Sequence, residues 1–191
     1  MIIDAHAHIF PDKIASKAVS AIGNFYGIEM YAGGGISDDL IESGSAINTS
    51  HYLVCSTATT VNQVESINHF IVGECKKHPE FVGFGTLHPD YEDIEGQVQV
   101  CIDNGLRGIK LHPDFQQFNI DDPKAYKIYE VTEGRLPILF HTGDDRYDFS
   151  SPVRLRHVID DFPNLTAFAA HFGGYQKWRE SVEYLAGLEN V

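Results

Sequence analysis

The stretch IIDAHAHIF at residues 2–10 joins a short apolar run to two histidines, His6 and His8, that are separated by one residue. Five similar runs follow, and their Val, Ile, Leu, Phe and Ala content is typical of strands that are buried on both faces. These runs are HYLVCST at 51–57, FVGFGTLH at 81–88, LRGIKLH at 106–112, LPILFHTG at 136–143 and LTAFAAHFGG at 165–174.

Amphipathic patterns separate the apolar runs. Apolar residues spaced three or four positions apart predict helices over 61–78, 92–105, 121–134, 150–163 and 175–188. From residue 51 onward the predicted strands start about every 25 to 30 residues, a rhythm typical of βαβ units with a parallel sheet. The sequence therefore predicts an α/β fold.

The interval between the first two predicted strands is longer than the others. It contains a helix-like segment at 11–22, three glycines at 33–35 and a second segment that begins at Ser37. We expect the glycines to form a mobile loop, either as a plain connector or beside the mouth of an active site.

Six β/α units are visible in 191 residues. A closed (β/α)8 TIM barrel has eight units and typically about 250 residues. We therefore predict one barrel-type domain over residues 1–191 with about six of its eight units, lacking strands seven and eight. An open sheet is the alternative.

The charge balance bears on the class of partner. The formal net charge is -13, a field that repels phosphate backbones and anionic lipids, so nucleic acids and membrane surfaces are not expected partners. No apolar run approaches the roughly 20 residues needed to span a bilayer, and the N-terminus does not resemble a secretory signal. Cys55, Cys75 and Cys101 are expected to be free thiols, and the expected location is the reducing cytoplasm.

Most of the histidines fall at one place in the predicted fold. In parallel α/β folds the active site lies at the carboxyl ends of the strands. Side chains at positions i and i+2 of a strand point to the same face, so His6 and His8 are expected to converge, with Asp4 on the same face. The histidines at predicted strand ends are His6, His8, His88, His112, His141 and His171.

The motifs DAHAHIFP, GIKLHP, FHTG and AAHFGG, in this order, resemble the amidohydrolase superfamily over nearly the whole chain. The most similar branch is the one that contains aminocarboxymuconate semialdehyde decarboxylase and many metal-dependent hydrolases. The resemblance implies that His6, His8 and His141 bind a divalent metal, usually zinc. It implies that His171 is a further ligand or the base that deprotonates a water.

Two residues of GIKLHP have more than one interpretation. Lys110 stands where some relatives carry a carboxylated lysine that bridges two metals, which would make it a metal ligand. A cation that neutralises nearby carboxylates or holds the substrate is the alternative. His112 shares the predicted face of Lys110 and is a candidate for substrate binding or for packing at the strand end.

The chain departs from the family in one important respect. Members place an essential Asp at the end of strand eight, and no such strand lies within these residues. Asp144 and Asp145 follow HTG directly but do not fill that role by motif. With Arg146 they could contact a polar small-molecule substrate, or Arg146 could form a surface salt bridge.

These features predict metal-dependent hydrolysis of a small amide, lactone or ester. Non-oxidative decarboxylation of an aromatic or muconate-type acid is the second hypothesis, and an inactive metal-binding fragment is the third. Six units would leave two strand edges open, so association between copies of the chain is a further expectation.

Overall fold

The computed structural model describes residues 1–30 and 34–191. Its strands are β1 (Ile2–His8), β2 (Thr49–Cys55), β3 (Phe81–Gly83), β4 (Gly85–Thr86), β5 (Ile109–Leu111), β6 (Ile138–Phe140) and β7 (Ala167–Ala169). Its helices are α1 (Asp12–Tyr26), α2 (Ser37–Ser45), α3 (Val64–Lys77), α4 (Ile94–Asp103), α5 (Pro113–Gln116), α6 (Pro123–Thr132), α7 (Pro152–Asp161) and α8 (Trp178–Tyr184), with a 3₁₀ turn η1 (Val61–Gln63) before α3.

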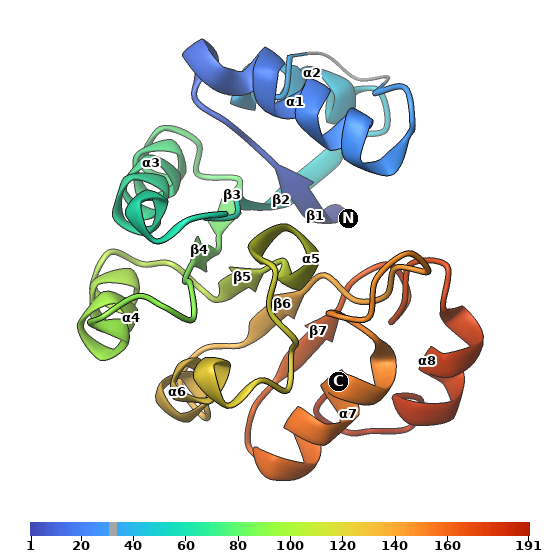
Figure 1. The fold of residues 1–191 in the computed structure, drawn as a ribbon. Helices are drawn as coiled ribbons and strands as arrows, with labels where there is room; N and C mark the ends of the chain where they lie inside the picture. The colour runs from blue at the N-terminus through green and yellow to red at the C-terminus, as the bar shows by residue number, and fades with distance from the viewer. Residues whose placement is uncertain (31–33) are drawn as a thin grey trace.

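The strands lie in the order of the sequence, and every pairing is parallel. The predicted third strand is divided at Phe84, so that β3 pairs with β2 and β4 pairs with β5. The six β/α units therefore form a partial barrel with helices outside the strands (Figure 1). This arrangement confirms the predicted fold class and the consecutive order of its units.

Two glycines allow the divided strand to lie close to its covering helices. A Cβ atom on Gly83 would lie 2.6 Å from the Cys75 sulfur of α3, and one on Gly85 would lie 2.9 Å from the Cys101 sulfur of α4. Real Cβ atoms do not approach other heavy atoms so closely, which explains why the FVGFG run requires glycine at these points.

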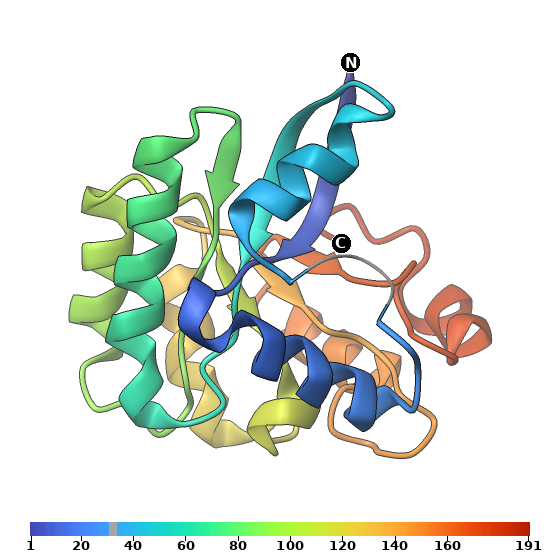
Figure 2. The same cartoon turned by 90° about the horizontal axis from the view of Figure 1, so that it is seen from above.

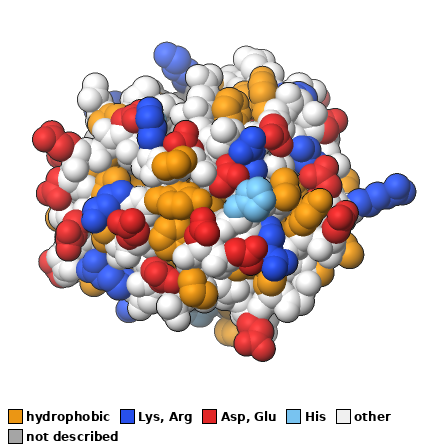
Figure 3. Space-filling model, turned by 60° about the horizontal axis from the view of Figure 1, so that its bottom comes forward, with side chains coloured by type: hydrophobic (Ala, Val, Ile, Leu, Met, Phe, Trp, Pro, Cys, Tyr) orange, Lys and Arg blue, Asp and Glu red, His pale blue; other side chains and the backbone are white. Residues whose placement is uncertain are grey.

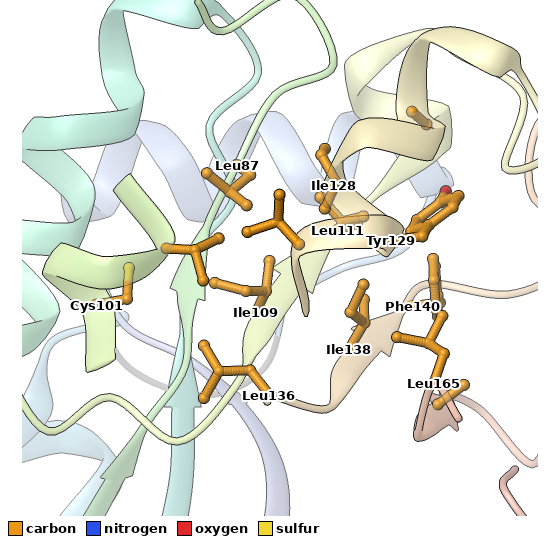
Figure 4. Close-up of a cluster of buried hydrophobic side chains, with 14 of the residues drawn as sticks. Leu87, Cys101, Ile109, Leu111, Ile128, Tyr129, Leu136, Ile138, Phe140 and Leu165 are labelled. Atoms are coloured by element: carbon orange, nitrogen blue, oxygen red, sulfur yellow. The ribbon is translucent and has the colours of Figure 1, made fainter. Parts of the chain in front are cut away.

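The main hydrophobic core lies between the strands and the helices that cover them. Ile109, Leu111, Ile138 and Phe140 are fully buried on neighbouring strands, as strands covered on both faces should be. Tyr129 of α6 is also fully buried, and its hydroxyl donates to the carbonyl of Ile120 at 2.7 Å (Figure 4). This packing fixes the carboxyl ends of β5 and β6.

Helix α1 is longer than the segment predicted at 11–22 and ends at Tyr26, where Gly27 adopts a left-handed conformation with φ of 65°. Although it has 15 residues, it buries only Ala15 and Gly23. The helix runs across the molecule beside the short helix α5 (Figure 2), and the ring of Phe25 contacts that of Phe115 with centroids 4.7 Å apart. The end of α1 thus lies over the loops that follow the strands.

The one-turn helix α5 was not predicted, although it positions much of the site. Gln116 accepts a hydrogen bond from the backbone N–H of His112 at 2.8 Å. Its amide donates to the carbonyls of Ala58 and Leu87 at 2.9 and 2.7 Å. A single buried side chain therefore joins the segments that follow β2, β4 and β5.

The glycine run at 33–35 was expected to be a mobile loop, and Gly33 lies outside the described residues.

Acidic and basic side chains are interspersed on the molecular face drawn in Figure 3. Among the described residues, no helix combines the length and the apolar character required for a membrane span.

Candidate metal centre

Strand β1 supplies the first two histidines of the site. The Nε2 atoms of His6 and His8 lie 3.1 Å apart, so the two rings converge as their spacing predicts. A register shift between Asp4 and Ala7 interrupts the regular alternation of the strand. The Asp4 carboxylate accepts a hydrogen bond from the backbone N–H of His6 at 3.1 Å, which ties it to the backbone at this shift.

His141 follows β6 and His171 follows β7. His141 Nδ1 lies 3.0 Å from His171 Nε2, and the ring centroids of His6 and His171 are 5.3 Å apart. His171 links the two parts of the site, because its ring lies beside that of His6 and contacts that of His141. The four imidazoles form a continuous cluster at the carboxyl ends of three strands.

The backbone at His171 is held in an unusual conformation. His171 and Phe172 have φ angles of 61° and 55°, in the left-handed region that costs a non-glycine residue about 1 to 2 kcal/mol. The indole N–H of Trp178 donates to the carbonyl of His171 at 2.9 Å and stabilises this turn. Such strain is concentrated at functional sites, where it directs a side chain toward its partners.

Burial keeps these imidazoles neutral. It is the largest cause that lowers the pKa of His8 to about 3 and that of His171 to about 4, and the positive charge of Lys110 is the next cause at both. Burial likewise lowers the pKa values of His6 and His141. Neutral imidazoles retain a lone pair, which is the form that binds a metal.

Lys110 lies on β5, and its side chain is completely buried. Its Nζ atom has no hydrogen-bond partner among the described residues, so the alternative in which it neutralises a nearby carboxylate is not seen. Burial lowers the pKa of Lys110 to about 8. The structure thus places an unpartnered amine beside the histidine cluster.

His112 lies at the end of β5 between two other rings. It stacks on Phe115 and on His141, with centroids 3.7 and 3.9 Å away. The Tyr26 hydroxyl lies 3.0 Å from His112 Nε2 and 3.4 Å from His141 Nε2. Tyr26 was not predicted, because only the tertiary position of α1 brings it to the strand ends.

Asp114 is the second site residue that the sequence did not indicate, although it stands two residues after His112. Its Oδ2 atom lies 3.6 Å from His141 Nε2 and accepts a hydrogen bond from the Ser150 hydroxyl at 2.5 Å. The other oxygen, Oδ1, is buried and has no hydrogen-bond partner among residues 1–30 and 34–191. Burial raises the pKa of Asp114 to about 6.

Cys55 lies near the β1 histidines but behaves as a structural thiol. It can be grouped with His6 and His8, since their ligand atoms lie within 4.8 Å of one another. Its thiol donates to the carbonyl of Ala7 at 3.6 Å, and burial raises its pKa to about 12. The protonated thiol is a poor metal ligand, and Cys55 is free and buried as the sequence predicted.

The predicted metal ligands are divided between two groups in the described part of the chain. His6 and His8 group with Cys55, whereas His141 groups with His112 and Asp114, each set within 4.8 Å. Two nitrogens on one tetrahedral zinc, at about 2.0 to 2.1 Å from it, lie roughly 3.3 Å apart. The His6–His8 pair, at 3.1 Å, is close to this spacing, so these two residues fit neighbouring positions on one zinc ion. Among the described residues, the groups whose ligand atoms all lie within 4.8 Å of one another do not join His6 and His8 to His141 or His171.

Arg146 is bound to the end of α1 and to its own loop. Its guanidinium donates to both oxygens of Asp144 at 2.9 and 2.6 Å, and to the carbonyl of Phe25. The guanidinium carbon lies 4.6 Å from the centre of the Phe25 ring. The salt bridge given above as the alternative for Arg146 is therefore present, with Asp144 as its partner. The contact of Arg146 with Phe25 joins the loop after β6 to α1.

A cavity of about 720 Å³ lies beneath α1 and reaches His8 and Asp114. Ala18, Ile22 and Phe25 line it from the helix. A larger cavity of about 1070 Å³ lies between α3 and α4 and contains none of the clustered histidines. Of these two cavities, the one beneath α1 reaches residues of the site.

The stability of the metal-free chain is expected to fall as the pH drops below about 6.5. Burial lowers the pKa values of His112 and His141, so the unfolded chain binds more protons than the folded chain in this range. Each histidine then lowers the free energy of unfolding by up to about 2 kcal/mol at pH 5. The raised pKa of Asp114 has the opposite effect, because the folded chain binds this proton more readily than the unfolded chain, and it offsets part of that loss.

Urea unfolding followed by circular dichroism at pH 7.5 and pH 5 measures this loss. A His141→Asn variant is expected to show a shallower dependence on pH. Equal unfolding free energies at the two pH values would show that these rings are not buried in the neutral form.

The model of the amidohydrolase protein family matches residues 3–191 of the chain. No curated protein matches it. Among solved structures, a presumed amidohydrolase from Staphylococcus aureus is 16% identical with a TM-score of 0.62, over 87% of this chain and 65% of that chain. A presumed 2-pyrone-4,6-dicarboxylic acid hydrolase from Pseudomonas putida is 18% identical with a TM-score of 0.57, over 97% of this chain and 64% of that chain. The chain thus spans less than two thirds of either structure. At these identities the similarity shows the fold alone.

Proposed function

The chain belongs to the amidohydrolase family, and we propose that it provides the metal site and base of a metal-dependent hydrolase for a small amide, lactone or ester. The observation that carries this proposal is the pair of close nitrogen contacts, 3.1 Å in the β1 pair and 3.0 Å between His141 and His171. His6, His8 and His141 would hold the cation. A bound divalent cation supplies Lewis acidity that polarises a carbonyl and makes water more acidic.

The chain's own residues would perform the proton transfer. His171 is the most exposed residue of the cluster, although its ring is partly buried, so it can face both water and substrate. Its neutral ring has one unprotonated nitrogen, which can accept a proton and return it to the leaving group, which is general acid–base catalysis. In this role His171 acts as a base, and the contact of its Nε2 with His141 Nδ1 orients the ring.

The substrate would enter through the cavity beneath α1. The helix supplies apolar side chains on one wall, while His8 and Asp114 mark the end near the cluster. The buried amine of Lys110 has no partner among the described residues, so a negatively charged group of the substrate could pair with it. Lys110 is otherwise the residue whose carboxylated form would provide a further metal ligand.

Lys110 also favours the second candidate, non-oxidative decarboxylation of an aromatic or muconate-type acid. An unpartnered ammonium is a suitable site for the carboxylate that such a reaction removes. This activity belongs to the aminocarboxymuconate semialdehyde decarboxylase-like branch. We place it second because the cluster provides a base, His171, for water attack.

A substrate screen separates these proposals. The zinc-supplemented chain is incubated with 2-pyrone lactones, simple amides and esters, hydroxybenzoates and muconate-type acids, and ring opening, acid release and CO2 release are followed. Hydrolysis that is lost after chelation is the expected result. CO2 release without hydrolysis would favour decarboxylation, and zinc binding without turnover of any substrate would favour a metal-binding chain without activity of its own.

A further inference from the structure

His141 presents its two ring nitrogens to two different environments. Nδ1 lies 3.0 Å from His171 Nε2, on the side of the proposed metal site. Nε2 lies 3.4 Å from the Tyr26 hydroxyl and 3.6 Å from Asp114 Oδ2. A neutral imidazole carries one proton, so only one of these nitrogens can offer a lone pair. Binding of a cation at Nδ1 requires the proton to be on Nε2.

Tyr26 favours the opposite arrangement. The backbone N–H of Phe115 donates to His112 Nδ1 at 3.3 Å, which places the proton of neutral His112 on Nε2. That N–H points at the Tyr26 oxygen, 3.0 Å away, and uses it as an acceptor. The hydroxyl proton of Tyr26 is then free to point at His141 Nε2, which would move the proton of His141 to Nδ1.

Asp114 opposes this effect. The residue is 4% exposed, and the Ser150 hydroxyl holds its Oδ2 atom in place at 2.5 Å. An ionised carboxylate accepts hydrogen bonds and does not donate them, so its charge favours an N–H on the facing nitrogen. Among the described residues, the Oδ1 atom of Asp114 has no hydrogen-bond partner. The carboxylate beside His141 can therefore accept a further hydrogen bond.

We propose that Asp114 is a positioning residue whose carboxylate keeps the proton of His141 on Nε2, so that the Nδ1 lone pair faces the metal site. This inference rests on the proposed function, because it assigns Asp114 a role in metal binding at that site. Partners of this kind fix both the tautomer and the orientation of a metal-binding histidine, and their loss typically weakens metal binding about 10- to 100-fold.

A second cation bound by His112, Asp114 and His141 is the competing explanation, since their ligand atoms lie within 4.8 Å of one another. One feature disfavours it. The Tyr26 hydroxyl lies within hydrogen-bond distance of both ring nitrogens, where such a cation would bind.

The test compares the wild-type chain with Asp114→Asn, which keeps the shape of the side chain and removes its charge. Long-range 1H–15N spectra of the metal-free chains at pH 8 report the tautomer of His141, and chelator competition reports zinc affinity. We expect Nε2–H in the wild type, a shift toward Nδ1–H in Asp114→Asn, and zinc binding weakened about 10- to 100-fold. Asp160→Asn, the same charge change on the exposed side of α7, is expected to alter neither measurement.

Tyr26→Phe tests the same competition without changing the buried carboxylate, and it keeps the proposal testable if Asp114→Asn fails to fold. It removes the competing donor, so we expect Nε2–H to persist and zinc to bind at least as tightly. A loss of affinity in Tyr26→Phe equal to that in Asp114→Asn would assign the role to Tyr26 and overturn the proposal.

Two other results would also overturn it. One is an unchanged His141 tautomer in Asp114→Asn. The other is a wild-type chain that binds two zinc ions and an Asp114→Asn chain that binds one, which would identify a second cation site. If the wild-type chain binds no zinc, the proposed function fails, and the ring spectra still determine whether Asp114 sets the tautomer.

Discussion

Replacement of both His6 and His8 by Asn is expected to weaken zinc binding by at least about 100-fold, more than the loss of an outer partner such as Asp114. The two Nε2 atoms are 3.1 Å apart, a spacing that suits two neighbouring positions of a tetrahedral donor set. Asn provides an amide of similar polarity but no imidazole nitrogen. Isothermal titration of the metal-free chain with zinc measures the loss directly.

The matched control for this experiment is His51→Asn. His51 is exposed on the neighbouring strand β2, where its Nδ1 atom lies 3.3 Å from the Ser50 hydroxyl. Its replacement is expected to leave zinc affinity unchanged. Zinc affinity in the double variant equal to that of the wild type would show that the cation, if bound, lies elsewhere.

Replacement of Lys110 by Met is expected to stabilise the metal-free chain by roughly 3 kcal/mol at pH 7, the value that corresponds to a pKa lowered from 10.5 to about 8. Met fills the same buried volume without a charge. In the wild type, stability should rise between pH 8 and 10.5, because the unfolded lysine is still protonated there while the folded one is neutral. Denaturant unfolding from pH 7 to 10.5 shows both effects.

Lys127→Met provides the control, since Lys127 is exposed on α6 beside Glu130 and its replacement should change stability by less than about 0.5 kcal/mol. Lys110→Met is also expected to lack the rise in stability above pH 8. A destabilised Lys110→Met chain that also loses zinc would instead support a carboxylated Lys110 that binds the metal.

The histidine cluster could be predicted from the sequence because local rules determine its position. Side-chain alternation along β1 brings His6 and His8 together, and the carboxyl ends of parallel strands meet at one edge. His141 and His171 follow apolar runs whose length and composition indicate buried strands. These residues depend on strand position alone, and the structure brings them into one cluster.

Tyr26 and Asp114 could not be predicted in the same way. Tyr26 reaches His112 only because α1 crosses the strand ends, and the apolar pattern of a helix does not specify which surface it covers. Asp114 lies in the one-turn helix α5, which is too short to produce a recognisable period. Its side chain is directed by contacts with Ser150 and His141, residues distant in sequence.

The boundaries of the elements were less predictable than their order. The third strand was predicted as one run at 81–88, whereas the structure divides it at Phe84 between two sets of neighbours. The division follows from close contacts of Gly83 and Gly85 with α3 and α4, which are tertiary contacts. Helix α8 is similarly shorter than the predicted 175–188, because tight turns occupy the residues before it.

The central claim is that imidazoles from β1, β6 and β7 meet at one cation. The most direct test is the metal content of the purified chain after zinc supplementation and dialysis, measured by inductively coupled plasma mass spectrometry. The geometry predicts close to one zinc per chain, with the His6→Asn, His8→Asn double variant near zero. A wild-type content below about 0.2 zinc per folded chain would contradict the claim.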